Sequence, residues 1–217
     1  MRMEKLIKKQ VTLSIFSFVL ISLLVIGTST AYLRGMATTS SYKSQIGKLN
    51  IDFTNGSTVV LATDPIEDAQ AIVNTDNIYN FKVSNNGSTD TDNVPYTYKV
   101  FLKSSAGQST TLDTRFIKYC LIEGDDGVDV STTGFTTSNC VPKSISSSTT
   151  FSSLQIASKE NLTITSGKNS KSYRLKVWLS NKYGSVLAPN SVIGKTYNLD
   201  IVICGQAGTK LSDLKSC

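Results

Sequence analysis

The strongest constraint on the fold is the strict alternation of residue types from Lys171 to Ser180, which reads KSYRLKVWLS. One set of alternate residues is apolar: Tyr173, Leu175, Val177 and Leu179. The residues between them, Arg174, Lys176 and Trp178, are mostly charged. Successive side chains of a β-strand point to opposite faces, so this pattern predicts a strand with one face on a core and one largely polar face.

The same alternation recurs in four other segments, so the prediction extends to the whole fold. These segments are residues 49–53, 79–83, 96–102 and 197–203. Turn sequences separate them: Asn55-Gly56 and residues 85–90, 124–127, 166–169 and 183–184. About eight short strands joined by such turns predict an all-β fold, a single antiparallel β-sandwich of jelly-roll or immunoglobulin-like type over residues 46–217.

Two segments interrupt this pattern. Pro65–Gln70 is the one expected helical turn, with Asp64 as its cap and Pro65 at its first position. Ser144–Ser153 is rich in serine and threonine and is expected to be a loop or an exposed edge.

The N-terminal residues are expected to act as an export signal. Val11–Leu33 contains 23 consecutive uncharged residues, which as one N-terminal hydrophobic helix would span about 34 Å, enough for a membrane core. Four basic residues against Glu4 precede it, which predicts a cytoplasmic N-terminus and an exported body. The protein is therefore expected to be extracytoplasmic.

Residues 1–31 fit two kinds of leader. Ser29 and Ala31 are small residues at the positions that a signal peptidase reads, so cleavage would fall between Ala31 and Tyr32. A stretch of this length can also remain as a transmembrane anchor that holds the protein at the cell surface. Cleavage is favoured, and residues 32–45 would then be an exposed stalk or a donor strand.

Net charge gives no support for nucleic acid as a partner. The chain carries +6, of which the first ten residues hold +3 (four bases less one acid), leaving +3 on the exported part. That part has no long basic cluster interleaved with aromatic residues, the pattern that nucleic-acid binding favours.

All four cysteines lie in the exported part, where disulfides form. Proximity in the sequence favours Cys120 with Cys140 and Cys204 with Cys217, although four cysteines allow three pairings. Cys120 could also be a small buried residue of the apolar run 117–122. The CxxC spacing typical of metal sites is absent.

The chain has no histidine, which excludes Ser-His-Asp, Cys-His and His-ligated metal chemistry built from this chain alone. A Ser-Lys arrangement remains in Ser40-Ser41-Tyr42-Lys43, but such a match arises by chance in a serine-rich chain. No enzymatic activity, catalytic residue or organic cofactor is expected.

Structural calcium is a weaker hypothesis. Glu123, Asp125, Asp126 and Asp129 share one glycine-flanked loop, and a second acidic loop contains Asp90, Asp92 and Asn93. Carboxylates suit a hard cation, but neither loop has the EF-hand spacing, and Asp with Gly is also typical of tight turns. Turn formation is favoured, so no metal is expected.

Trp178, the only tryptophan, lies on the polar face of its strand. It could be exposed and bind a sugar or another surface. Alternatively, both faces of the strand could be covered. Burial is favoured because tryptophan is highly buried on average.

Several segments resemble the biofilm-matrix fibre and camelysin group of secreted proteins from Gram-positive bacteria. They are Ala31-Tyr32 after the leader, GKLNIDF (Gly47–Phe53), YNFKVSNNGSTD (Tyr79–Asp90) and YTYKVFLK (Tyr96–Lys103). The resemblance covers the first half of the exported region and implies a jelly-roll-like sandwich. In some members an N-terminal strand of one subunit completes the sheet of the next, which makes Tyr32–Gln45 the candidate donor. The four cysteines depart from that family's pattern.

We therefore expect a non-enzymatic surface or extracellular-matrix structural protein that is able to form a homopolymer by strand addition. The alternative is a monomeric adhesin that binds carbohydrate or protein at the cell surface.

Overall fold

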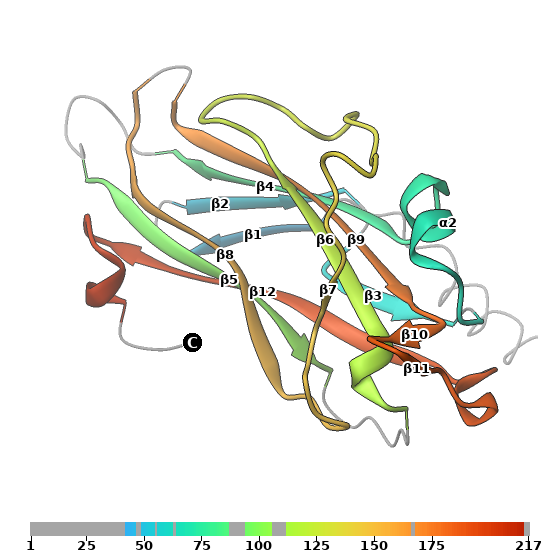
Figure 1. Ribbon diagram of the computed structural model, residues 1–217. Coiled ribbons are helices and arrows are strands. Elements are labelled where there is room, and N and C mark those ends of the chain that lie inside the picture. The colour runs from blue at the N-terminus through green and yellow to red at the C-terminus, as the bar shows by residue number, and fades with distance from the viewer. Residues whose placement is uncertain are drawn as a thin grey trace, which may run out of the picture. The chain divides into compact units, whose positions relative to one another are not determined.

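The computed structural model describes residues 42–46, 49–54, 56–62, 64–86, 94–105, 112–165 and 168–214. These residues form an all-β antiparallel sandwich of a six-stranded and a four-stranded sheet (Figure 1). The strand order is β1-β2-β4-β9-β6-β7 in the larger sheet and β3-β12-β5-β8 in the smaller one, and a two-stranded ribbon pairs β10 with β11. The predicted fold class is confirmed.

The strands of the larger sheet are β1 (Tyr42–Ile46), β2 (Leu49–Phe53), β4 (Ile78–Asn85), β6 (Ile117–Glu123), β7 (Lys143–Ser144) and β9 (Ser170–Leu179). Those of the smaller sheet are β3 (Thr58–Leu61), β5 (Tyr96–Ser104), β8 (Ser153–Leu162) and β12 (Tyr197–Ala207). The ribbon is β10 (Lys182–Tyr183) and β11 (Val186–Leu187). The helical elements are α2 (Asp68–Val73) and three 3₁₀ turns, Thr114–Phe116, Asn190–Val192 and Leu211–Asp213.

The main core lies between the two sheets and follows from the alternation in the sequence. In β9, Tyr173, Leu175, Val177 and Leu179 are all at most 1 % exposed and belong to this core. Two hydroxyls are buried with them, and they satisfy each other across the sheets, with Tyr98 Oη 2.9 Å from Tyr173 Oη. Burial raises the pKa of both phenols, so they are neutral hydrogen-bonding groups of the core.

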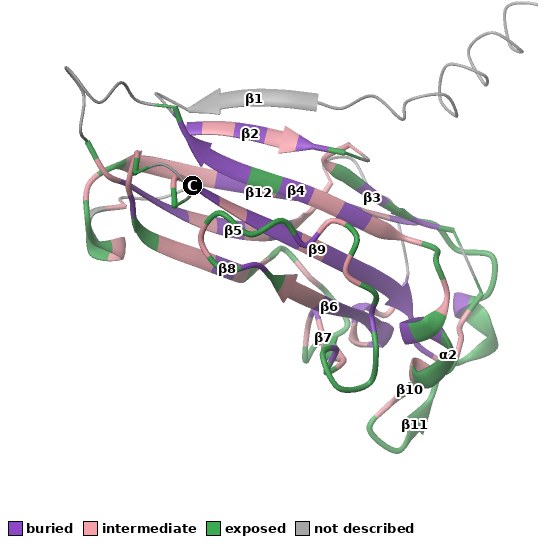
Figure 2. Ribbon diagram, turned by 90° about the horizontal axis from the view of Figure 1, so that it is seen from above, coloured by how far each residue is buried: buried purple, intermediate pink, exposed green. Residues whose placement is uncertain are grey.

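A second cluster covers part of the outer face of the larger sheet. It consists of Ala71, Ile72, Cys120, Phe135, Cys140 and Trp178. Helix α2 and the loop 124–142 supply the residues that cover β9 and β6, so this face is buried at one end (Figure 2). Trp178 is 2 % exposed, and the predicted burial of both faces of its strand is confirmed.

The predicted start of the helical turn is wrong. Helix α2 begins at Asp68 with Glu67 as its N-cap, three residues after the predicted first position Pro65. The reason is that Ile66 forms a parallel bridge with Ser180 and exchanges backbone hydrogen bonds with Leu179 and Asn181. An extended residue at this position delays the first helical turn.

The predicted boundary of the sandwich also shifts. Residues 42–46 form β1, which pairs antiparallel with β2, so the last four residues of the predicted stalk 32–45 belong to the sheet of their own chain. The rest of that stalk and the leader 1–31, with its cleavage site at Ala31 and Tyr32, lie outside the described residues. Among the described residues, no helix is long and apolar enough to cross a membrane.

Candidate functional site

The edge of the larger sheet at β6 is only partly covered. Strand β7 pairs with Lys118 and Tyr119 of β6 and goes no further. The Ile117 carbonyl accepts a hydrogen bond from Ile145 on the β7 side, whereas the Gly124 N–H bonds to Ser172 on the β9 side. Because backbone groups alternate in direction along a strand, those of Leu121 and Glu123 point away from β9 toward the open edge.

A groove lies beside this open edge. It has a volume of about 380 Å³ and is lined by Tyr119, Cys120, Leu121, Glu123, Asn139, Val141, Lys143 and Ile156. Ile156 belongs to β8, which in the described part of the chain pairs with β5 alone and is therefore the edge strand of the smaller sheet. The groove thus follows the seam where an edge of each sheet is unpaired, and unpaired strand edges are templates for an added strand.

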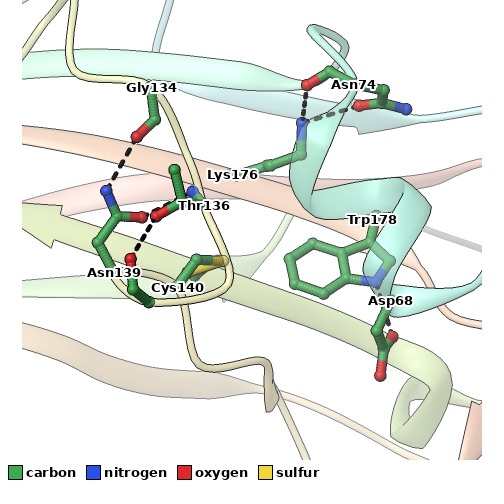
Figure 3. The surroundings of a disulfide bond; sticks show 10 residues. Asp68, Asn74, Gly134, Thr136, Asn139, Cys140, Lys176 and Trp178 are labelled. Atoms are coloured by element: carbon green, nitrogen blue, oxygen red, sulfur yellow. Dashed lines mark hydrogen bonds between the residues drawn. A yellow bond between two sulfur atoms is a disulfide. The ribbon is translucent and has the colours of Figure 1, made fainter.

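The loop between β6 and β7 forms one wall of the groove, and a disulfide holds it there. Cys140 lies between the wall residues Asn139 and Val141 and is joined to Cys120 of β6, with Cα atoms 5.5 Å apart. Asn139 accepts from the Thr136 N–H and donates to the Gly134 carbonyl, so the tip of the loop is tied to itself (Figure 3).

The other side of the disulfide packs on the outer-face cluster. Trp178 Nε1 donates to Asp68 Oδ1 at 3.1 Å (Figure 3). The Ser180 hydroxyl donates to the same oxygen at 2.7 Å. Lys118 forms an ion pair with the other carboxylate oxygen. Burial raises the pKa of Asp68, but the hydrogen bonds from Lys118, Ser180 and Trp178 outweigh it, and the net pKa is lowered. Asp68 therefore anchors α2 on β9 as a carboxylate.

Lys176 secures the opposite end of α2. It is 1 % exposed, and its Nζ donates to the Asn74 carbonyl at 2.7 Å, to Asn74 Oδ1 at 2.8 Å and to the Asp76 carbonyl at 3.1 Å. Asn74 is the C-cap of α2, so an ammonium group from β9 satisfies the carbonyls at the helix end. Burial lowers the pKa of Lys176 to about 8.

The structure does not gather the predicted calcium candidates into a site. Glu123 ends β6, Asp126 forms an ion pair with Lys159 at 2.7 Å, and Asp129 Oδ1 accepts from the Ser131 N–H as in a turn. Asp125 accepts a backbone hydrogen bond from Val128 through its carbonyl. Within the described ranges, no three acidic, histidine or cysteine side chains are close enough to share a metal ion. Asp90, Asp92 and Asn93 lie outside these ranges.

The remaining sequence-predicted positions are only partly described. Cys204 is disulfide-bonded, while Cys217, its predicted partner, lies outside the described residues, as do Ser40 and Ser41 of the Ser-Lys match. Trp178 is buried and does not offer an exposed platform for a sugar. The groove could not be predicted from the sequence. Ile156 lies in β8, and two register shifts against β5 interrupt the alternation of that strand. The apolar run 117–122 was the available signal.

Comparisons with known proteins find no match: no protein-family model, no curated protein and no solved structure matches the chain.

Proposed function

We propose that this chain is an exported, non-enzymatic surface or extracellular-matrix structural protein that assembles by strand addition at the groove beside β6. The observation that carries the proposal is the open backbone edge of Leu121 and Glu123 next to a groove of mixed lining, with apolar Tyr119, Leu121, Val141 and Ile156 beside polar Glu123, Asn139 and Lys143. An extended segment bound there would gain backbone hydrogen bonds from the edge and bury apolar side chains in the groove.

The order of the strands supports assembly into fibres. Strand β1, which follows the N-terminal segment, and the β6–β7 edge are at opposite ends of the larger sheet. A segment that leaves one edge of a subunit and adds to the opposite edge of the next makes a head-to-tail contact. Such a contact does not close on itself unless the rotation permits a ring, so it propagates.

The donor segment is shorter than the sequence predicts. Because residues 42–45 pair with β2 of their own chain, the proposed donor is Tyr32–Ser41. Ten extended residues reach about 33 Å, which is more than the width of six strands spaced about 4.8 Å apart. The segment is thus long enough to reach a neighbouring subunit while β1 stays in place.

The predicted leader supports the proposed exported location, and the composition of the chain supports the proposed structural role. An apolar run of 23 residues with a basic start is typical of a segment that directs the following chain outward. The absence of histidine excludes most hydrolytic mechanisms. With Trp178 buried, the adhesin alternative has lost its main candidate for a sugar-binding surface.

Electron microscopy of two purified bodies tests the proposal. Residues 32–217 should form ordered filaments, whereas residues 42–217, which lack the donor, should stay dispersed. Dispersed monomers of the longer body that bind glycans would refute the proposal in favour of the adhesin. A separate measurement, the intact mass of the exported protein, distinguishes a released protein from an anchored one, because cleavage removes 31 residues.

A matched pair of variants locates the acceptor. Glu123→Pro removes the outward N–H at the edge of β6, and proline is tolerated at edge positions of this kind. Glu123→Ala removes the same carboxylate but keeps the N–H. Filaments should be lost in the proline variant and retained in the alanine variant. Equal assembly of the two would show that strand addition takes place elsewhere.

A further inference from the structure

Apart from the covalent disulfide, few contacts of polar groups tie the wall of the groove to the sheet. Among the described residues, the hydrogen bonds of residues 134–142 all remain within this stretch: Thr136 with Asn139 and Ser138, and Asn139 with Gly134. The first ties to the sheet lie earlier in the loop, where Gly124 and Gly127 bond to β9. Between Gly127 and Lys143 the Cys120–Cys140 bond is thus the one covalent anchor.

Noncovalent packing of this stretch is limited to a few side chains. Phe135 lies under the cations of Arg174 and Lys176, at 5.7 and 5.8 Å from the ring centre, and Cys140 is 1 % exposed in the outer-face cluster. By contrast, the wall residue Val141 is 68 % exposed. Without the disulfide, Asn139 and Val141 are held near β6 only indirectly, by the pairing of β7 that starts at Lys143 and by the packing of Phe135 in the outer-face cluster.

We propose that the groove beside β6, which accepts the added strand, forms only when Cys120 and Cys140 are oxidised. Subunits therefore assemble only after export from the reducing cytoplasm. This inference rests on the proposed function and names its regulation. In the cytoplasm the two thiols stay reduced and the loop is free to leave the edge of β6. Outside, oxidation fixes the wall and completes the groove.

The chemistry is thiol–disulfide exchange with an extracytoplasmic disulfide oxidant. One of the two thiolates attacks the oxidant's disulfide, forming a mixed disulfide and releasing one thiol of the oxidant. The second thiolate then attacks the protein sulfur of that mixed disulfide, forming Cys120–Cys140 and releasing the second thiol. Two electrons pass to the oxidant, which is reduced from disulfide to dithiol, and the two protein thiols give up their protons.

The test measures binding of a synthetic peptide, residues 32–41, to the body 42–217 by fluorescence anisotropy. This body is suitable because every buried residue of both hydrophobic clusters lies between Leu49 and Ile203. The oxidised body should bind, and the double variant Cys120→Ala with Cys140→Ala should bind at least tenfold more weakly. Circular dichroism must show at the assay temperature that the variant is folded. Equal affinity of the two bodies would overturn the inference.

A titration of the wild-type body in glutathione buffers keeps the proposal testable if the double variant does not fold. Peptide binding should follow the oxidised fraction of Cys120–Cys140, determined by mass spectrometry, and not that of the disulfide at Cys204. Binding that persists after Cys120–Cys140 is reduced would also overturn the inference. Absence of peptide binding to the fully oxidised body would instead refute the proposed function itself.

Discussion

Removing the Cys120–Cys140 disulfide should destabilise the sandwich by about 3 kcal/mol. The two cysteines are 20 residues apart, and closing a loop of this length removes about 11 cal/mol/K of entropy from the unfolded chain. Both residues are at most 2 % exposed, so alanine at the two positions leaves a cavity, which is small because each change removes a single sulfur atom. The melting temperature should fall by roughly 10 °C.

Urea denaturation at neutral pH measures the effect. Trp178 is the only tryptophan and packs in the same cluster as the disulfide, so its fluorescence reports on this cluster, and circular dichroism reports on the sheets. Val141→Ala is the matched control, because this exposed position of the same loop should change the free energy of unfolding by less than about 0.5 kcal/mol. A loss below about 1 kcal/mol in the double variant would refute the loop-closure argument. Unfolding curves that differ between the two probes would indicate that the cluster opens before the sheets.

Three further predictions concern the outer-face cluster. Trp178→Ala should cost about 3 to 5 kcal/mol of unfolding free energy, followed by circular dichroism, because it empties the centre of the cluster. Lys176 has its pKa lowered by burial from 10.5 to about 8, so the unfolded chain holds the proton more tightly and stability should rise by about 2 kcal/mol from pH 8 to 10. Lys176→Met should lack this rise, and identical pH profiles of the two proteins would contradict the assignment. Asp68→Asn should cost about 2 kcal/mol at pH 7 by removing the ion pair to Lys118. Since the pKa of Asp68 is lowered below 3.8, the wild type's advantage should persist above that value and disappear as the pH falls through the lowered pKa, as urea titrations from pH 7 to 2 would reveal.

The sandwich could be predicted because the residues of its main core alternate with polar residues along single strands. The alternate apolar residues that the sequence identifies face the space between the sheets, as do Leu199, Ile201 and Ile203 of β12. Strand β8 escaped the prediction because its register against β5 shifts twice, and β3 because four residues are too few to show a period. Periodicity therefore finds regular strands and misses the irregular edge that borders the groove.

The covered outer face could not be predicted from local pattern, because its contacts join distant parts of the chain. Asp68 and Ser180 are 112 residues apart, and Lys176 is 102 residues from Asn74. The face of β9 with Arg174 and Lys176 has the composition of a solvent-facing surface. Lys176 is nevertheless buried, because α2 brings carbonyl acceptors to it.

The composition of that polar face nevertheless indicates that it is covered. Trp178 lies on it in β9, and Cys120 lies on the equivalent face of β6, next to Lys176 in the register. Tryptophan and cysteine are among the residues most often removed from water, and lysine is among those least often removed. A strand face that mixes the two kinds is best explained by a cover that brings its own polar partners, here the helix end at Asn74 and the carboxylate of Asp68. The same two residues, a tryptophan and a cysteine at polar positions, would predict a covered face in other sandwiches whose long-range contacts are unknown.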